Sequence, residues 1–391
     1  MERLLVKNVK IKGLDRDVLL EGEKILRIAT AIAPEPGDRT LEGEGMLAIP
    51  GLVDCHTHID KSHLNDGGRT HFVHGTGAVK GGLTREQKAL FTQEDVTQRA
   101  EKVLQTALCS GTLHLRTNCD VDAIVGLTGI KALLDLREKY RDLLHLQIAA
   151  FAQEGVFQDG QTQSLLEEAL RLGADLVGGH TITCGEGEKH IDFILTLAEK
   201  YGVEADFHLD ESGNREHYLL PYLARRVKEL GLQGRVNAIH MCTLSALTQP
   251  ELEEALHLAA DCGLKVTVAP TAISTRQIAP VKALLEAGLP VGLGSDNIRD
   301  FFNPLGSGDI KQIALLLSYL QAFFTEEETE QIWTMLTDGG ARVLGIPDYG
   351  LTEGGRADLT LFPAQDIREV LANQVQPRFI IRKGSLLNMG V

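Results

Sequence analysis

Residues 49–58 read Ile49-Pro50-Gly51-Leu52-Val53-Asp54-Cys55-His56-Thr57-His58. This run predicts an apolar strand that ends in two histidines with one residue between them. Side chains alternate between the two faces of a strand, so His56 and His58 point the same way. Two imidazoles together at the end of a buried strand suit a divalent metal of the zinc or iron type. Taken alone, the pair fits a metal site and a merely polar strand end equally well.

Short apolar strands alternate with amphipathic helices from about residue 47 to residue 346. Strands that alternate with helices predict a parallel sheet, and a count of eight favours a closed barrel. The first strand ends in histidines where a dinucleotide-binding sheet has a glycine-rich loop, which argues against that fold. The helices repeatedly stop at glycines, which allow a left-handed final turn: Gly111, Gly173, Gly202, Gly231, Gly263 and Gly288. The predicted strands are Ala48–His56, Thr112–Asn118, Leu146–Phe151, Leu176–His180, Ala205–His208, Val236–His240, Lys265–Ala269 and Val291–Gly294.

The two ends of the chain differ from the middle. Short β-like segments occur within residues 2–46 and 357–388, and neither end has enough apolar residues for its own core. We therefore predict a small β-sandwich domain built from residues 1–49 and 347–391, beside a (β/α)8 TIM-type barrel over residues 50–346. Such a barrel carries its active site at the C-terminal ends of its strands, so catalytic residues are expected there.

Composition narrows the range of partners. The chain of 391 residues has 39 Lys and Arg against 54 Asp and Glu, a net charge of −15. No basic cluster resembles a phosphate-binding surface, so nucleic acid is not an expected partner. No apolar run is long enough to span a bilayer, so no membrane association is expected, and the N-terminus has no signal-peptide core. The six scattered cysteines are expected to be reduced thiols, so we predict a cytoplasmic location.

Four predicted strand ends carry histidine or acidic side chains. One divalent metal can be bound by His56, His58, His208 and Asp296. A bound metal lowers the pKa of a water molecule and so makes a hydroxide nucleophile, and Asp296 can also take that proton. Glu211, just past the fifth strand, can move a proton to a ring nitrogen and on to a leaving amine. His240, at the end of the sixth strand, can orient the water or polarise the substrate.

These residues in this order resemble the amidohydrolase superfamily over nearly the whole chain, and within it the cytosine deaminase group. The resemblance implies the same four metal ligands, Glu211 as the proton shuttle and His240 as the residue that orients water. It also implies that Gln153 holds the ring amide of the substrate and that Phe302 flanks the ring, where a tryptophan is more usual. The motifs that carry it are His56-Thr57-His58-Ile59-Asp60-Lys61, Leu115-Arg116-Thr117, Ala150-Phe151-Ala152-Gln153-Glu154-Gly155, His208-Leu209-Asp210-Glu211 and Ser295-Asp296-Asn297.

A second branch of the superfamily is resembled as well. Residues 295–301, 304–309 and 340–346 are similar to the N-isopropylammelide amidohydrolases of triazine breakdown. Glu211 favours the cytosine deaminase group, because it takes part in chemistry while the other stretches can be scaffold. Two departures from the deaminase pattern leave the substrate ring open. Asn118 follows Arg-Thr at the end of the second strand where a histidine is usual, and His180 ends a fourth strand that matches the family poorly.

We therefore predict a metal-dependent hydrolytic deaminase that releases ammonia from a small amino-substituted N-heterocycle, with cytosine as the lead substrate. The alternatives are release of an alkylamine from an N-alkyl triazine, and deamination of isoguanine, 5-methylcytosine, creatinine or a pterin. A barrel that binds a metal or a heterocycle without turnover is the alternative of another class. The predicted substrate contacts are Gln153, Phe302, Asn118 and His180.

Three further features of the enzyme follow from the same pattern. One divalent ion, zinc or iron, is expected rather than two, because the fourth strand end offers no lysine to be carbamylated into a bridge. The Gly-rich stretch of residues 66–82 is either a lid over the substrate or a plain connecting loop. The oligomeric state stays open, with a homo-oligomer as one alternative.

Overall fold

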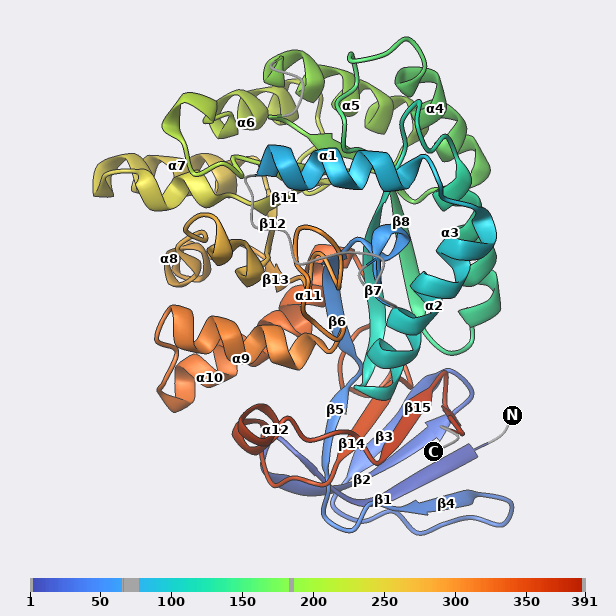
Figure 1. Cartoon of the computed structure of the whole chain (residues 1–391). Coiled ribbons are helices and arrows are strands. Elements are labelled where there is room, and N and C mark those ends of the chain that lie inside the picture. Colours follow the sequence, from blue (N-terminus) through green and yellow to red (C-terminus); the bar gives the residue numbers. More distant parts are fainter. Residues whose placement is uncertain (1–2, 65, 67–76, 183–185, 389–391) are drawn as a thin grey trace.

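Eight parallel strands form the larger sheet of the computed structural model, which describes residues 3–64, 66, 77–182 and 186–388. A parallel bridge between Thr57 and Asp296, and a 2.8 Å hydrogen bond from the Asp296 N–H to the His56 carbonyl, join the last strand to the first. The predicted (β/α)8 TIM-type barrel is therefore confirmed (Figure 1). In spatial order its strands are β6 Leu52–Thr57, β7 Thr112–Asp120, β8 His145–Ala152, β9 Leu176–His180, β10 Glu204–Leu209, β11 Val236–His240, β12 Lys265–Val268 and β13 Val291–Leu293.

Helices connect the strands and cover the outside of the barrel (Figure 1). One large core holds apolar side chains from every barrel strand and from the helices packed on them. Within the described ranges, no helix combines the length and the apolar character that a membrane crossing needs. The helices are α1 Gly77–Lys88, α2 Gln93–Cys109, α3 Thr128–Tyr140, α4 Thr162–Leu172, α5 Gly187–Tyr201, α6 Leu220–Glu229, α7 Gln249–Asp261, α8 Val281–Glu286, α9 Ile310–Leu320, α10 Glu326–Met335, α11 Asp338–Leu344 and α12 Ile367–Asn373.

Local sequence signals set several helix ends. The six glycines predicted to close helices all have positive φ, between 62° at Gly263 and 115° at Gly173. These are backbone conformations that side chains with a Cβ atom adopt at a cost. At the N-terminus of α10, Thr325 and Glu328 form a capping box.

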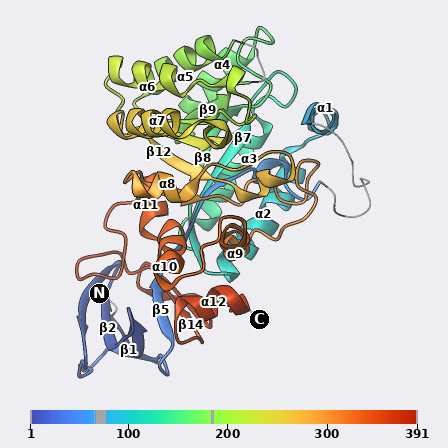
Figure 2. The same ribbon diagram turned by 90° about the vertical axis from the view of Figure 1, so that its left-hand side faces the viewer.

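Both ends of the chain build the second sheet, which lies at one end of the molecule (Figures 1 and 2). A single core joins residues from the two termini, such as Val6 and Val18 with Leu359 and Ile381. The small β domain predicted from both termini is therefore present, and sharing a core explains why neither terminus is apolar enough alone. Its strands are β1 Arg3–Ile11, β2 Leu14–Glu21, β3 Lys24–Ala29, β4 Arg39–Glu42, β5 Leu47–Pro50, β14 Leu359–Phe362, β15 Phe379–Arg382 and β16 Ser385–Leu386.

The first predicted strand, Ala48–His56, is wrong as one element, because the structure divides it in two. Strand β5 belongs to the small sheet and pairs antiparallel with β14, whereas β6 begins at Leu52 and belongs to the barrel. Gly51 lies at the change of sheet, where a Cβ atom would be 2.5 Å from Cδ1 of Leu113. Both sheets bury their part of the run, so the apolar pattern is continuous across the boundary.

Part of the Gly-rich stretch of residues 66–82 is helical. Helix α1 includes residues 77–82 of that stretch, whereas residues 67–76 lie outside the described residues. The last residue of α1, Lys88, is buried and fixes the helix to three acids. Its Nζ atom lies 3.0 Å from Asp120 Oδ2, 2.5 Å from Asp122 Oδ2 and 2.9 Å from Glu154 Oε1.

Candidate active site

The C-terminal ends of the barrel strands surround a cavity of about 680 Å³. This volume lies in the range of pockets that enclose small molecules. Its wall also includes side chains of α1, so this helix covers part of the opening. Two of the predicted site residues, His56 and Asn118, are fully buried and are not among the residues that line the cavity. The predicted residues that line the cavity are His58, Gln153, His180, His208, Glu211, His240, Asp296 and Phe302.

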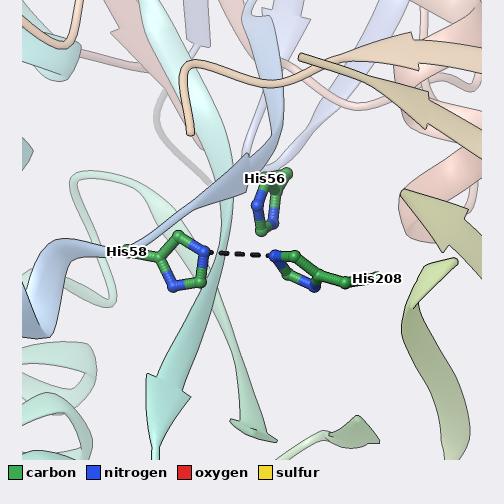
Figure 3. Close-up of side chains that lie close together, drawn as sticks. All are labelled: His56, His58 and His208. Carbon is green, nitrogen blue, oxygen red and sulfur yellow. Dashed lines mark hydrogen bonds between the residues drawn. The ribbon is translucent and has the colours of Figure 1, made fainter. Parts of the chain in front are cut away.

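Three histidine rings meet at the centre of the site (Figure 3). Nε2 of His58 lies 3.3 Å from Nε2 of His208. The ring of His56 stands at 84° to that of His58, with 4.8 Å between the ring centroids. Oδ1 of Asp296 lies 3.3 Å from Nε2 of His56 and 3.7 Å from Nε2 of His58. The structure thus brings together all four side chains that were predicted to bind one metal.

Asn118 determines which nitrogen of two of these rings is protonated. Its backbone oxygen lies 3.1 Å from Nδ1 of His58, and its side-chain oxygen lies 3.2 Å from Nδ1 of His56. A carbonyl oxygen only accepts hydrogen bonds, so each Nδ1 carries the proton and each Nε2 keeps its lone pair. Asn118, predicted as a substrate contact, therefore touches the histidines and is absent from the described lining of the cavity.

These donor atoms fit a divalent cation. Burial lowers the pKa of His58 and of His208 well below the usual value, so both rings are neutral and able to ligate. Burial opposes the charged form of Asp296, but the contact with His56 holds the pKa of this carboxyl below its usual value. Neutral imidazoles and a carboxylate are ligands of zinc and of iron. Lone pairs that converge in a buried place are costly to leave without a cation or a proton donor.

The backbone at two strand ends is shaped to form this cluster. Asp296 has φ of 60° and His240 has φ of 75°, in the left-handed region that residues other than glycine seldom adopt. Such conformations concentrate at functional sites, where the surroundings hold them in place. A Cβ atom on Gly294 would lie 2.6 Å from Cβ of His56. Only glycine therefore allows β13 to approach β6 closely enough for Asp296 to reach the histidines.

Glu211 lies beside the metal cluster, just after β10. Its Oε2 lies 2.7 Å from Nε2 of His180, and its Oε1 lies 4.0 Å from Nε2 of His240. Arg276 forms an ion pair with the same carboxylate through Nη2. Burial favours the protonated acid, but the neighbouring His240, His180 and Arg276 outweigh it and hold the pKa of Glu211 well below its usual range. The carboxylate is therefore ionised and can accept a proton.

Gln153 presents a fixed amide to the cavity. Nζ of the buried Lys61 lies 3.0 Å from Oε1 of Gln153 and 2.9 Å from Oδ1 of Asp120. An ammonium group only donates hydrogen bonds, so it has to face the amide oxygen of Gln153. The amide NH₂ group is then the part of Gln153 that is left for a ligand.

Three cationic residues of the cavity wall were not predicted from the sequence: Lys80, Arg85 and Arg276. Phe302 lies in the wall as predicted, but its carbonyl oxygen also accepts a hydrogen bond of 3.2 Å from Nζ of Lys80 on α1. Arg85, also on α1, pairs with Glu154. Arg276 follows β12, the one barrel strand in this half of the chain without a histidine or an acid at its end. A search of the strand ends for metal ligands therefore does not select that strand. A single arginine in the loop that follows has no sequence pattern that would mark it as a site residue.

Comparison with known proteins adds a family context to this geometry. Residues 40–378 match the sequence pattern of the Amidohydrolase family. The N-isopropylammelide isopropyl amidohydrolase of Pseudomonas sp. (strain ADP) is 33% identical over 394 aligned positions, which cover 98% of this chain and 96% of that protein. The structure of N-isopropylammelide isopropylaminohydrolase from Burkholderia multivorans matches with a TM-score of 0.92 and 32% identity, over 99% of this chain and 98% of the other. The 5-methylcytosine deaminase from Klebsiella pneumoniae matches with a TM-score of 0.90 and 28% identity, over 100% and 98%.

Proposed function

This chain belongs to the amidohydrolase family, and from that premise we propose that it hydrolyses the bond between a ring carbon and an exocyclic amine of a small nitrogen heterocycle. The observation that carries the proposal is the place of Glu211. Its ionised carboxylate lies in the cavity, in contact with His180 and beside His240, next to the three-histidine cluster. A carboxylate so placed suits proton transfer between a water molecule and a ring nitrogen.

The cluster of His56, His58, His208 and Asp296 would hold one divalent ion, zinc or iron. Such an ion supplies Lewis acidity that makes water a nucleophile near neutral pH. Asn118 supports this role, because it fixes the tautomers of two rings so that each Nε2 offers a lone pair. Partners of this kind orient metal ligands and raise their basicity.

The residues of the cavity next to the histidine cluster transfer the protons and hold the ring. Glu211 accepts a proton as water adds to the ring carbon and gives it to the adjacent ring nitrogen. The proton of the added hydroxyl then passes to the exocyclic nitrogen, the carbon–nitrogen bond breaks, and the amine leaves while the carbon becomes a carbonyl. His240 is neutral, because burial lowers its pKa to about 4, so it can hydrogen-bond the attacking water without carrying a charge. Gln153 and Phe302 hold the ring, by a hydrogen bond and by contact with its face.

The lead reaction is deamination of a ring of the cytosine type, with ammonia as the product. The relative that acts on 5-methylcytosine supports it, as does the ionised Glu211. Release of an alkylamine from an N-alkyl triazine is the second candidate. It is supported by the 33% and 32% identity to the two enzymes named for N-isopropylammelide. Both reactions break the same kind of bond and differ in the amine that leaves.

A product assay separates these reactions. The purified protein is incubated with cytosine, 5-methylcytosine, a pterin and an N-isopropylamino triazine, and both ammonia and isopropylamine are measured. We expect one of these amines to be released, and Glu211→Gln to lower kcat by at least ~100-fold while the metal content is unchanged. Glu216→Gln, which alters a carboxylate five residues further on and outside the cavity, is expected to retain the wild-type rate. A near-normal rate in Glu211→Gln would remove this residue from the mechanism.

A further inference from the structure

Helix α1 covers part of the cavity but is not held there by an apolar face. Five of its residues line the cavity, and the helix lies at the margin of the molecule (Figure 2). Val79 is 48% exposed, and neither Val79 nor Leu83 belongs to a hydrophobic core of the described residues. Most helices in proteins are stabilised by packing of such a face. The position of α1 therefore depends on its polar contacts.

These polar contacts hold the two halves of α1 unequally. In the C-terminal half, Lys88 contacts three carboxylates, and Arg85 pairs with Glu154, which is one of the three. The N-terminal half, as far as the structure describes its side chains, has one such contact with the rest of the chain. Nζ of Lys80 donates a 3.2 Å hydrogen bond to the carbonyl oxygen of Phe302. A single hydrogen bond is readily exchanged for one to water, whereas breaking up a buried charge cluster is costly.

Two glycines, Gly81 and Gly82, separate the two halves and line the cavity. A Cβ atom on either glycine would have no other atom within 4 Å, so packing does not require glycine at these positions. Glycine in the interior of a helix is destabilising relative to alanine. A pair of small residues is a usual place for a helix to bend, and hinges often contain such residues. The glycine pair therefore suits a hinge between the fixed half and the weakly held half.

We propose that the N-terminal half of α1 is a lid that moves about a hinge at Gly81 and Gly82. Lys88 and Arg85 keep the C-terminal half in place, and the hydrogen bond from Lys80 to Phe302 holds the lid closed. Opening admits a ligand to the cavity, and closure separates the bound ligand from water. The inference goes beyond the proposed function, because it applies to any small molecule that enters the cavity.

The distance between two spin labels, measured by pulsed electron paramagnetic resonance in frozen solution, tests the hinge without any ligand. One label is attached to Cys109, the exposed cysteine at the end of α2, and the other to Val79→Cys or to Glu86→Cys. The other described cysteines are buried, and Cys184→Ser is present in every variant. We expect two populations of distance for the label at residue 79, beyond the hinge, and one for the label at residue 86, on the anchored half.

Two further variants separate the closing contact from the hinge. Lys80→Met removes the bond to Phe302 and should increase the open population by at least ~3-fold. Gly81→Ala combined with Gly82→Ala should decrease it by at least ~3-fold, because alanine favours the straight helix. The matched control is Gly160→Ala. A Cβ atom at Gly160 also has no other atom within 4 Å, but this residue lies outside the cavity wall, so both populations should match those without the change.

The inference is overturned if the label at residue 79 gives a single distance both with Lys80 and in Lys80→Met, or if the two alanines leave the open population unchanged. Two populations at residue 86 as well as at residue 79 would show that the whole helix moves, and would overturn the hinge. None of these results depends on turnover. A single distance together with amine release would contradict this inference alone, and two distances without any amine release would contradict the proposed function alone.

Discussion

Asn118 decides how two histidines present their nitrogens at the centre of the site. Its two oxygens hold Nδ1 of His56 and Nδ1 of His58, so that each Nε2 faces inward with its lone pair. The side-chain contact can be removed by mutation, whereas the backbone contact to His58 stays. Asn118 therefore offers a way to disturb the metal site without touching a ligand.

We predict that Asn118→Ala weakens zinc binding by ~10–100-fold, because this is the usual effect of losing a partner that orients a metal-bound histidine. The measurement is a competition titration against a chelator of known affinity. Asn373→Ala, at the exposed end of α12, is the control and should bind zinc like the wild type. Unchanged affinity in Asn118→Ala would show that the rings hold their orientation without the side chain.

Some of the site residues could be predicted from the sequence alone, and the contacts of others could not. His56, His58, His208, His240 and Asp296 could be found because the barrel rule directs attention to strand ends, and the strands were predictable from their apolar runs. The contacts of two other residues could not be found, since they depend on where a side chain or a loop reaches. Lys61 contacts Gln153 from the short turn after β6, and Arg276 lies in a loop eight residues past β12.

Helix α1 is an element that could not be predicted from the sequence, for the same reason. The Gly-rich stretch of residues 66–82 suggested a lid or a plain connecting loop, but the buried Lys88 at the end of α1 contacts three carboxylates from other segments. Ion pairs of that kind join parts of the chain that are far apart in sequence, so periodicity does not indicate them. Because α1 carries Lys80 and Arg85 into the cavity wall, this anchor also positions part of the substrate site.

We predict that Lys88→Met destabilises the protein by about 3–5 kcal/mol, because it leaves buried carboxylates without a cation. The loss should appear in the free energy of unfolding measured in urea, and amide hydrogen exchange should become faster in residues 77–88 than elsewhere. Lys131→Met removes an exposed lysine from α3 and serves as the comparison, with a change below about 0.5 kcal/mol. Equal exchange rates in α1 of both variants would argue against the anchor.

The two ends of the barrel hold different features: the cavity lies at one end, and ion pairs between strands lie at the other. The cavity lies at the C-terminal ends of the strands, and buried ion pairs occupy the opposite end. Arg116 on β7 lies 3.2 Å from Glu204, and Lys265 on β12 also contacts Glu204 at 2.5 Å. His145 starts β8 in this region, where burial, with the charge of Arg382, lowers its pKa to about 4.

This half-buried histidine predicts how acid affects stability. The unfolded chain takes up a proton at His145 near pH 6.5, whereas the folded chain does so only near pH 4. The unfolded state therefore binds more protons between these values, and stability falls as the pH drops through them. From pH 7 to pH 5 the loss from this group is about 2 kcal/mol, so His145→Gln should flatten the pH dependence of the unfolding free energy by that amount. His257→Gln, at an exposed position on α7, should leave the slope as it is.

In the function proposed for this amidohydrolase, one divalent ion, held by His56, His58, His208 and Asp296, is required to release an amine from a heterocycle. The most direct measurement is the rate of amine release by chelator-stripped protein as zinc or iron(II) is added back. We expect no release from the stripped protein, and a rate that rises to a plateau at one equivalent of metal per chain. Full activity in metal-free protein, or a plateau reached only at two equivalents, would contradict it.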